Sequence, residues 1–334
     1  MKIRALSTVA VVPLAVALSL PAWADSVLTT VHVGNEPAGI AANPFTDKIY
    51  VALDADLKVA VINGRTNQVS STIPLAGHPL RIAVNVFTNR IYSTSCDFGT
   101  GQCSIYVING RRDTVIANIP LNTRQGIGLQ GVGVNPVTNR IYVSDADNSL
   151  VYVINGRSNT VIAQVSVPSP AGIAVNPKTN RIYVANGGFP GALFVLDGAT
   201  NTQIARIPLS AGADQVAANF RLNRAYAAMN SNALAVVDGA TNQVVTNVPT
   251  GLFPTGVDVN LLNNKIYVAN GNSSSVTILD GNTDQVLQTL PVPGNFLEGV
   301  TVNPINGRTY VTDFFSGTVI VLQPDLTEER FDQE

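Results

Sequence analysis

The chain has 334 residues, of which 46% are apolar and 13% are charged, and its formal net charge is −2. Low charge combined with this apolar content argues against a disordered chain and against a coiled coil. A charge so close to neutral also excludes the electrostatic footprint of a protein dedicated to duplex DNA.

The N-terminal segment 1–24 has the three parts of a secretory signal peptide. Lys2 and Arg4 precede an apolar stretch over 5–20, and Ala22-Trp23-Ala24 has the small-x-small pattern of a cleavage site. We predict cleavage after Ala24 and a periplasmic or secreted mature protein, with a retained anchor as the alternative. No apolar run of about 18 residues follows, so the sequence predicts no later membrane span.

One sequence unit recurs seven times after this segment. Its marker is a cation, an apolar or small residue and a tyrosine, and successive tyrosines lie 42, 50, 41, 43, 41 and 43 residues apart. We attribute the spacing of 50 to an insertion of about eight residues around a cysteine loop. The seven copies are Lys48-Ile49-Tyr50, Arg90-Ile91-Tyr92, Arg140-Ile141-Tyr142, Arg181-Ile182-Tyr183, Arg224-Ala225-Tyr226, Lys265-Ile266-Tyr267 and Arg308-Thr309-Tyr310.

Each unit predicts four short strands. The first ends in asparagine before a turn such as Asn135-Pro136-Val137-Thr138-Asn139, and the second carries the marker. The third ends in Asn-Gly or Asp-Gly, which is a strong hairpin signal before a fourth strand. A unit of about 42 residues cannot bury its faces alone. The sequence therefore predicts an all-β fold, a β-propeller of seven blades with four antiparallel strands each.

The two ends of the repeat region predict how the ring closes. Residues 27–33 match a fourth strand but precede the first complete unit, whereas the last unit stops after 319–322. We therefore expect the N-terminal strand to complete the last blade, which removes two exposed sheet edges. The propeller is predicted over 25–323, and the acidic remainder, 324–334, as a disordered tail.

Cys96 and Cys103 are the only cysteines in the chain. In an exported protein two cysteines this close predict a disulfide that closes a local loop. A metal-binding pair is the weaker reading, because the mature chain has only two histidines.

The repeat resembles the YVTN family of β-propeller repeats. The resemblance rests on Asn-Pro-x-Thr-Asn-Arg-Ile-Tyr-Val-Ala-Asn followed by Val-Ile-Asp-Gly-x-Thr-Asn, and it covers essentially all of 27–322. Members of that family include exported bacterial YncE-like proteins and archaeal surface-layer proteins. The resemblance implies the propeller fold and a binding or surface role, and it brings no catalytic motif.

Residues present in every unit are predicted to be structural. We expect the cation of the marker to bind turn carbonyls or a neighbouring carboxylate, with an anion-binding ring as the alternative. We expect the asparagine that ends each first strand to hold the following turn through side-chain to backbone bonds.

Departures from the repeat provide the candidate binding residues. Small residues occupy the middle of most first strands, so Asp258 and the nearby Thr301 are candidates for a cation or polar ligand in the central channel. The connections between second and third strands and between blades are irregular and share one face, which predicts a binding surface there. The residues we place on this face are Asp54, Asp56, His78, Arg81, Arg124, Gln125, Asp145, Asp147, Asn186, Phe189, Asp214, Asn230, Phe253, Asn270, Phe296, Glu298, Asp313, Phe314 and Phe315.

No catalytic motif stands out in the sequence. There is no Gly-x-Ser-x-Gly elbow, no His-Glu-x-x-His pair and no phosphate loop. Our leading hypothesis is an exported, monomeric, non-catalytic protein that needs no cofactor and presents its variable face to a protein or a cell-envelope component, with single-stranded nucleic acid as a further option. The alternative is a hydrolase or lyase that uses a divalent cation near Asp258. An accessory role in a periplasmic redox system also stays open, although the chain lacks a heme-attachment motif.

Overall fold

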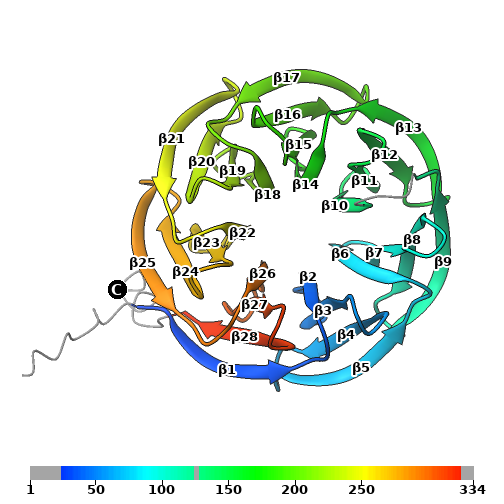
Figure 1. The fold of residues 1–334 in the computed structure, drawn as a ribbon, viewed down its shortest axis with the longest axis horizontal. Coiled ribbons are helices and arrows are strands. Elements are labelled where there is room, and N and C mark those ends of the chain that lie inside the picture. Colours follow the sequence, from blue (N-terminus) through cyan, green and yellow to red (C-terminus); the bar gives the residue numbers. More distant parts are fainter. Residues whose placement is uncertain (1–23, 124–127, 325–334) are drawn as a thin grey trace, which may run out of the picture.

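The computed structural model describes residues 24–123 and 128–324. These residues form 28 strands and no helix, in seven sheets of four antiparallel strands arranged as a ring (Figure 1). The predicted seven-bladed β-propeller is confirmed. The described residues include no helix that could cross a membrane. The predicted signal peptide and acidic tail lie outside the described residues, apart from Ala24 and Pro324.

Each blade contributes its strands in chain order from the axis of the ring to its outer wall. Blade 1 consists of β2 (Pro37–Asn43), β3 (Lys48–Leu53), β4 (Lys58–Asn63) and β5 (Gln68–Pro74); blade 2 of β6 (His78–Asn85), β7 (Arg90–Asp97), β8 (Gln102–Asn109) and β9 (Thr114–Leu121); blade 3 of β10 (Leu129–Asn135), β11 (Arg140–Asp145), β12 (Leu150–Asn155) and β13 (Thr160–Ser166). Blade 4 consists of β14 (Pro170–Asn176), β15 (Arg181–Asn186), β16 (Ala192–Asp197) and β17 (Thr202–Pro208); blade 5 of β18 (Ala213–Asn219), β19 (Arg224–Met229), β20 (Ala233–Asp238) and β21 (Gln243–Pro249); blade 6 of β22 (Pro254–Val259), β23 (Lys265–Asn270), β24 (Ser275–Asp280) and β25 (Gln285–Pro291).

Blade 7 is built from both ends of the described chain. Its strands are β26 (Leu297–Val302), β27 (Thr309–Asp313), β28 (Thr318–Gln323) and, outermost, β1 (Ser26–His32). β1 pairs antiparallel with β28, with Thr30 opposite Ile320, and the two lie side by side in Figure 1. The predicted closure of the ring is therefore confirmed.

The core of the protein lies between neighbouring blades. The second and third strands of a blade are buried on both faces, because each blade packs against a neighbour on either side. Tyr92 of blade 2, for example, packs in one cluster with Ile141 and Val143 of blade 3. The fourth strands form the outer wall and are exposed or half-buried except at one residue, such as Ile73 or Val165. The tyrosine of the marker is thus the residue that fills the space between blades.

The asparagine that ends each first strand holds its turn, as predicted, and also links blades. Asn43 Oδ1 accepts the backbone N–H of Phe45 over 3.2 Å, and Asn43 Nδ2 donates to Asn89 Oδ1 of the next blade over 2.8 Å. Across the closure, Asn303 Nδ2 donates to Asp47 Oδ1 of blade 1 over 2.7 Å. Among the described residues, bonds of this kind join neighbouring blades at every junction except that between blades 6 and 7.

In blades 1, 2, 5 and 7 the cation of the marker binds the hairpin of the next blade, whereas Arg181 pairs with Asp197 of its own blade over 3.0 Å. Lys48 Nζ donates to the carbonyl of Gly110 over 3.0 Å and lies 2.7 Å from Asp113 Oδ2. Arg308 Nη1 donates to the carbonyl of Gly64 over 2.6 Å. These contacts confirm the structural prediction for the cation, since their charge is directed at a neighbouring hairpin.

The long spacing in blade 2 comes from two places. β7 and β8 have eight residues each, where β3 and β4 have six, so the hairpin that carries Cys96 and Cys103 is longer. The remaining additional residues lie in the connection 122–128, which joins blade 2 to blade 3. The predicted disulfide is present between Cys96 and Cys103, which face each other across the two strands.

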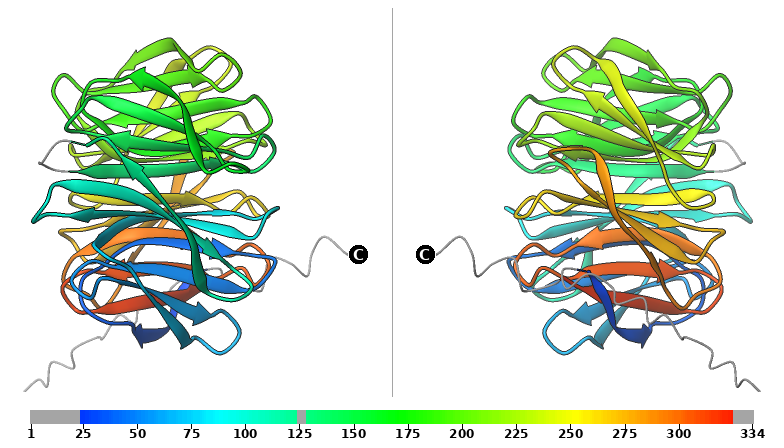
Figure 2. Two further views of the ribbon diagram at one scale, coloured as in Figure 1. Left: turned by 90° about the vertical axis from the view of Figure 1, so that its right-hand side faces the viewer. Right: turned by 90° about the vertical axis from the view of Figure 1, so that its left-hand side faces the viewer.

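Seen from the side, the connections between strands lie along two faces of the ring (Figure 2). We call the loop face the one formed by the connections between second and third strands and between blades. We call the turn face the opposite one, formed by the turns between first and second strands and the hairpins between third and fourth strands.

Candidate functional site

The loop face is held together by backbone hydrogen bonds between its two kinds of connection. Asp54 N–H donates to the carbonyl of Glu36 over 3.0 Å, and Phe314 N–H donates to the carbonyl of Phe296 over 2.8 Å. Similar bonds occur in other blades, such as that between Gly271 and Phe253 over 2.8 Å. Both kinds of connection therefore share one face, as the sequence predicts.

Four phenylalanines form a continuous aromatic cluster on the loop face of blades 6 and 7. The ring centroids of Phe253 and Phe296 are 6.3 Å apart, those of Phe296 and Phe315 are 5.7 Å apart, and those of Phe315 and Phe314 are 5.2 Å apart. Phe315 is 65% exposed, while the other three are half-buried. We call this group the aromatic cluster. It places a large apolar surface where the sequence predicts a binding face.

Backbone contacts fix the loops that carry the aromatic cluster. Asp313, which is almost fully buried, accepts the N–H groups of Asn295 and Phe296 on Oδ1 over 3.1 and 3.2 Å. Phe253 has a φ of 54° and donates its N–H to Asn232 Oδ1 over 2.9 Å. The rings are therefore presented by ordered loops, which lowers the entropy cost of binding a partner.

A second, smaller aromatic contact lies on the loop face of blades 1 and 2. The ring centroids of His78 and Phe98 are 4.8 Å apart, and His78 Nδ1 lies 3.0 Å from Asp54 Oδ1. Phe189, on blade 4, is 93% exposed. It has no ring contact with the aromatic cluster among the described residues.

Several polar residues predicted for the loop face lie beneath its surface. Asp145 is fully buried and accepts hydrogen bonds from Asn148 N–H over 3.0 Å and from the Tyr152 hydroxyl over 3.3 Å. Asn186 and Asn270 are also buried and bind other residues of their loops. They support the loops and are not available to a partner. Arg124 and Gln125 lie outside the described residues.

Asp258 links two blades instead of facing a free channel. Its Oδ1 accepts the N–H of Val259 and its Oδ2 accepts the N–H of Val302 in blade 7, both over 2.8 Å. Thr301 Oγ1 continues the pattern by accepting the N–H of Ala42 in blade 1 over 3.2 Å. Burial raises the pKa of Asp258 to about 6, against the opposing effect of these N–H groups. Among the described residues no group of three or more His, Cys, Asp or Glu side chains could hold a metal ion.

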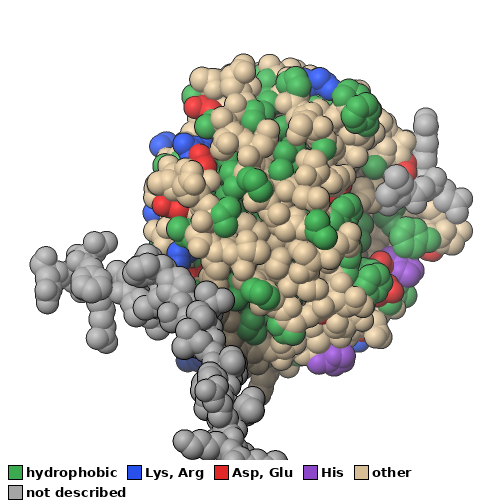
Figure 3. All heavy atoms as spheres, turned by 60° about the vertical axis from the view of Figure 1, so that its left-hand side comes forward, with side chains coloured by type: hydrophobic (Ala, Val, Ile, Leu, Met, Phe, Trp, Pro, Cys, Tyr) green, Lys and Arg blue, Asp and Glu red, His purple; other side chains and the backbone are tan. Residues whose placement is uncertain are grey.

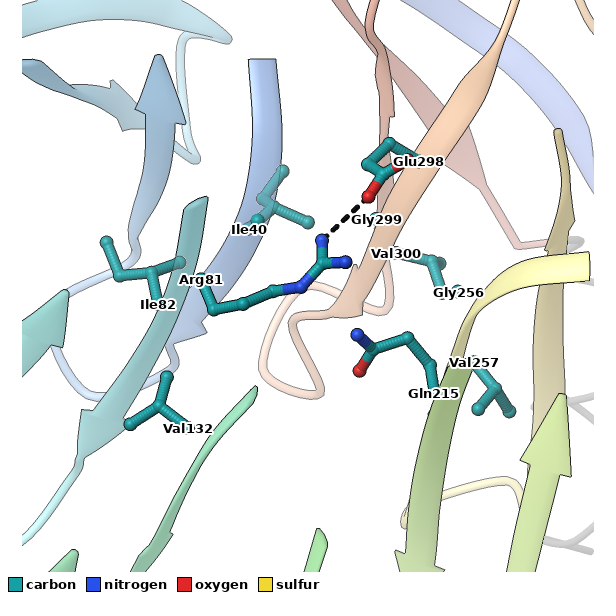
Figure 4. Close-up of a pocket in the computed structure, with 11 residues that line it drawn as sticks. Ile40, Arg81, Ile82, Val132, Gln215, Gly256, Val257, Glu298, Gly299 and Val300 are labelled. Carbon is teal, nitrogen blue, oxygen red and sulfur yellow. Dashed lines mark hydrogen bonds and ion pairs between the residues drawn. The ribbon is translucent and has the colours of Figure 1, made fainter. Parts of the chain in front are cut away.

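The first strands enclose a central channel with a pocket of about 80 Å³ (Figure 4). Arg81 and Glu298 face each other across it, and Arg81 Nη1 donates to Glu298 Oε1 over 2.7 Å. Arg81 Nε also donates to the carbonyl of Gln130 over 3.1 Å. The sequence prediction placed Arg81 on the loop face, but it belongs to strand β6 and its charge is paired inside the channel. Gly39 also lines the pocket, and its missing side chain lets β2 approach the backbone of β6 at Leu80, Arg81 and Ile82.

A further polar residue of this channel, Gln215, comes from β18. Gln215 points into the pocket from the side opposite Ile40 and Ile82 (Figure 4). Burial raises the pKa of the neighbouring Asp214, with the charge of Arg81 lowering it and that of Glu298 raising it. The sequence reasoning missed Gln215. A signal was present, because five of the seven blades have glycine at the position that Arg81 and Gln215 occupy.

Comparison with known proteins supports the fold alone. No protein-family model and no curated protein matches the chain. Among solved structures it is similar to a chain of the hydrazine synthase of Kuenenia stuttgartiensis, with a TM-score of 0.74 and 16% sequence identity. The match covers 87% of this chain and 96% of the other. The likeness agrees with the seven-bladed propeller, and the identity is too low to carry an activity from one protein to the other.

Proposed function

We propose that this protein is an exported, non-catalytic propeller of the YVTN type, which binds a partner protein through the aromatic cluster of its loop face. The contact between the four phenylalanine rings carries the proposal. Aromatic residues are enriched at the centres of protein interfaces, where a few of them supply most of the binding energy. Here four such rings adjoin one another, and Leu252 beside Phe253 is also exposed.

The surroundings of the aromatic cluster favour an apolar segment of protein over a nucleic acid. Binding to single strands requires cations beside the stacking rings. Of the two cations that the sequence offers for this purpose, Arg81 is largely buried and paired with Glu298, and Arg124 lies outside the described residues. The charged residue that holds the loop of Phe296 is Asp313, which is an acid and is buried. An apolar peptide segment would bury the exposed ring of Phe315 without needing a counter-charge.

Photo-crosslinking tests the proposal. A photoreactive phenylalanine analogue at position 315 is expected to capture one partner protein in the native host, identified by mass spectrometry, and the same analogue at position 189 is expected not to capture it. With the purified partner, Phe296→Ala or Phe315→Ala should weaken binding by about thirtyfold, the size of an interface hot spot. Phe189→Ala serves as the control on the same face. Equal binding by all three variants would remove the aromatic cluster as the interface.

The proposal of export rests on the sequence of residues 1–24 and is supported by the Cys96–Cys103 disulfide, since disulfides persist in oxidising compartments. The mass of the protein recovered from the envelope or the medium tests it. We expect a chain that begins at Asp25. A full-length protein in the cytoplasmic fraction would contradict the proposal of export without affecting that of partner binding.

A further inference from the structure

The turn face carries exposed apolar side chains at equivalent positions of five blades. Each turn between a first and a second strand has its tip two residues after the buried asparagine. Five adjoining blades, from blade 6 through blade 7 to blade 3, have an apolar residue at this tip, and each is 62–67% exposed. These five tips are Leu262, Ile305, Phe45, Phe87 and Val137.

The fold does not require apolar residues at these tips. In every blade the tip donates only its backbone N–H to the buried asparagine, as Phe87 does to Asn85 over 3.1 Å. Blades 4 and 5 have Lys178 and Arg221 at the tip, and both make the same hydrogen bond over 3.1 Å. Cations are thus accepted at a position where five blades expose a large apolar side chain to solvent. Five adjoining blades thus place exposed apolar side chains at one equivalent position of the turn face.

On the turn face, the hairpins of blades 1 to 3 differ in charge from those of blades 4 to 6. In blades 1 to 3 the hairpin corner is a neutral asparagine followed by glycine and an exposed arginine, as in Asn63-Gly64-Arg65. In blades 4 to 6 the corner is an aspartate, and alanine or asparagine replaces the arginine, as in Asp197-Gly198-Ala199. The exposed arginines of the first group are Arg65, Arg111, Arg112 and Arg157.

This division by charge is not dictated by the geometry of the hairpin. Asn63 Oδ1 accepts the N–H of Arg65 over 2.9 Å, and Asp197 Oδ1 accepts the N–H of Ala199 over 2.8 Å. Either corner residue therefore makes the hairpin, and in blade 4 the aspartate also pairs with Arg181 over 3.0 Å. Asp113, an acid among these arginines, is paired with Lys48 at 2.7 Å. In Figure 3, which brings the left-hand side of Figure 1 forward, Lys, Arg, Asp and Glu side chains lie together along the left-hand edge, and the histidines lie at the lower right.

We propose that the turn face of blades 1 to 3, together with the apolar tips of blades 6 and 7, binds the surface of an anionic phospholipid bilayer. Apolar tips that enter the interface and basic side chains that contact lipid phosphates are the two ingredients of reversible membrane binding. Here the phenylalanines of blades 1 and 2 supply the first and the four exposed arginines supply the second. This face is separate from the aromatic cluster, so a partner bound to the loop face would point away from the membrane.

The arrangement favours a bilayer over a nucleic acid. Three of the five tips are aliphatic, namely Leu262, Ile305 and Val137, and aliphatic side chains offer no ring for a base to stack on. The arginines are on the hairpins nearer the outer wall, whereas the tips are near the axis. Cations and apolar side chains therefore do not alternate along one line, as a bound single strand of nucleic acid would require. The surface of a bilayer offers charged headgroups to the arginines and an apolar interior to the tips at the same time.

Flotation of the purified protein with vesicles tests the proposal. We expect the protein to float with vesicles of phosphatidylcholine and phosphatidylglycerol, to do so weakly with phosphatidylcholine alone, and to be released by salt. Phe45→Ser combined with Phe87→Ser should lower partitioning about tenfold. Arg111→Gln combined with Arg112→Gln should lower it about fivefold for each charge removed.

Two control variants replace exposed apolar side chains elsewhere on the protein with serine. Phe189→Ser lies on the loop face and Ile204→Ser lies on the outer wall, and both should float like the unaltered protein. Thermal melts verify that every variant is folded. The proposal is overturned if the unaltered protein fails to float, if the control variants lose as much as the turn-face variants, or if the arginine variant alone is affected and an acidic polypeptide or oligonucleotide competes with the vesicles.

Discussion

Lys265 Nζ lies 3.1 Å from Asp25 Oδ1, and this ion pair joins blade 6 to the strand that closes the ring. The Tyr267 hydroxyl donates to Asp25 Oδ2 over 2.6 Å. In blade 1 the equivalent residues, Lys48 and Tyr50, bind Asp113, which stands just before the fourth strand of blade 2. Asp25 stands just before β1, the fourth strand of blade 7, and so takes the same place in the repeat.

We expect Asp25→Ala to lower the free energy of unfolding by about 3 kcal/mol or more, because it leaves Lys265 buried without a counter-charge. The side chains of Lys265 and Asp25 are only 9% and 2% exposed. Urea unfolding of the purified variant measures the effect. Asp113→Ala is the matched control, since Lys48 and Asp113 are 24% and 13% exposed and the lone lysine there can reach water. Equal losses for the two variants would contradict the special role of the closure.

Asp258 predicts a specific pH dependence of stability. Its pKa is about 6 in the folded protein and 3.8 in the unfolded chain, so the folded state binds the proton more tightly. The contribution is fully present below about pH 4 and is lost as the pH rises through about 6. Asp258→Asn removes the titration, and the difference in unfolding free energy between variant and parent should therefore change by up to about 3 kcal/mol across this range. A difference that does not vary with pH would refute the shifted pKa.

The Arg81–Glu298 pair predicts a coupling energy across the channel. Glu298→Ala alone leaves the Arg81 guanidinium without its carboxylate in a largely buried site, and should cost about 2 kcal/mol. Adding Arg81→Gly restores the residue found at this position in five blades, and should recover most of the loss. A double-mutant cycle measured by urea unfolding checks this, and losses that simply add would show that the two residues act independently.

Removal of the disulfide should have a local effect. Cys96→Ser combined with Cys103→Ser opens a small loop, and we expect a loss of at most roughly 2–3 kcal/mol. Hydrogen exchange should rise in residues 97–102 and near Gly128, whose α-carbon faces Cys96 Sγ, while exchange in blade 5 stays unchanged. Exchange that rises throughout the ring would show that the bond supports the whole fold.

The fold could be predicted from the sequence because each blade repeats the same local signals. The Asn-Gly and Asp-Gly hairpins, the turn asparagines and the buried tyrosines occur at fixed spacing, and the unpaired strand at 27–33 indicates the closure. Copies of one unit constrain the number of blades and the order of the strands, which a single copy cannot do.

The candidate site could be predicted only in part. The neighbourhood of Phe296 and Phe315 follows from topology, because both kinds of connection end on one face. The burial of Asp145 and Asn270 does not, since a polar loop residue can bind either solvent or the N–H groups of its own loop. Arg81 was placed wrongly because its paired state depends on Glu298, which lies 217 residues away and meets it only across the channel.

Since Ser26 lies opposite Gln323 in the closing pair of strands, the described chain enters and leaves the ring at one point of the wall. A short hairpin ending in Asp25 would join the two ends in the way that every other third strand is joined to its fourth. Circular permutants opened in any other blade should then keep all seven sheets. The two described ends therefore lie on the turn face, in the place of the hairpin of blade 7, so a domain fused there would stand beside the surface proposed to bind a bilayer.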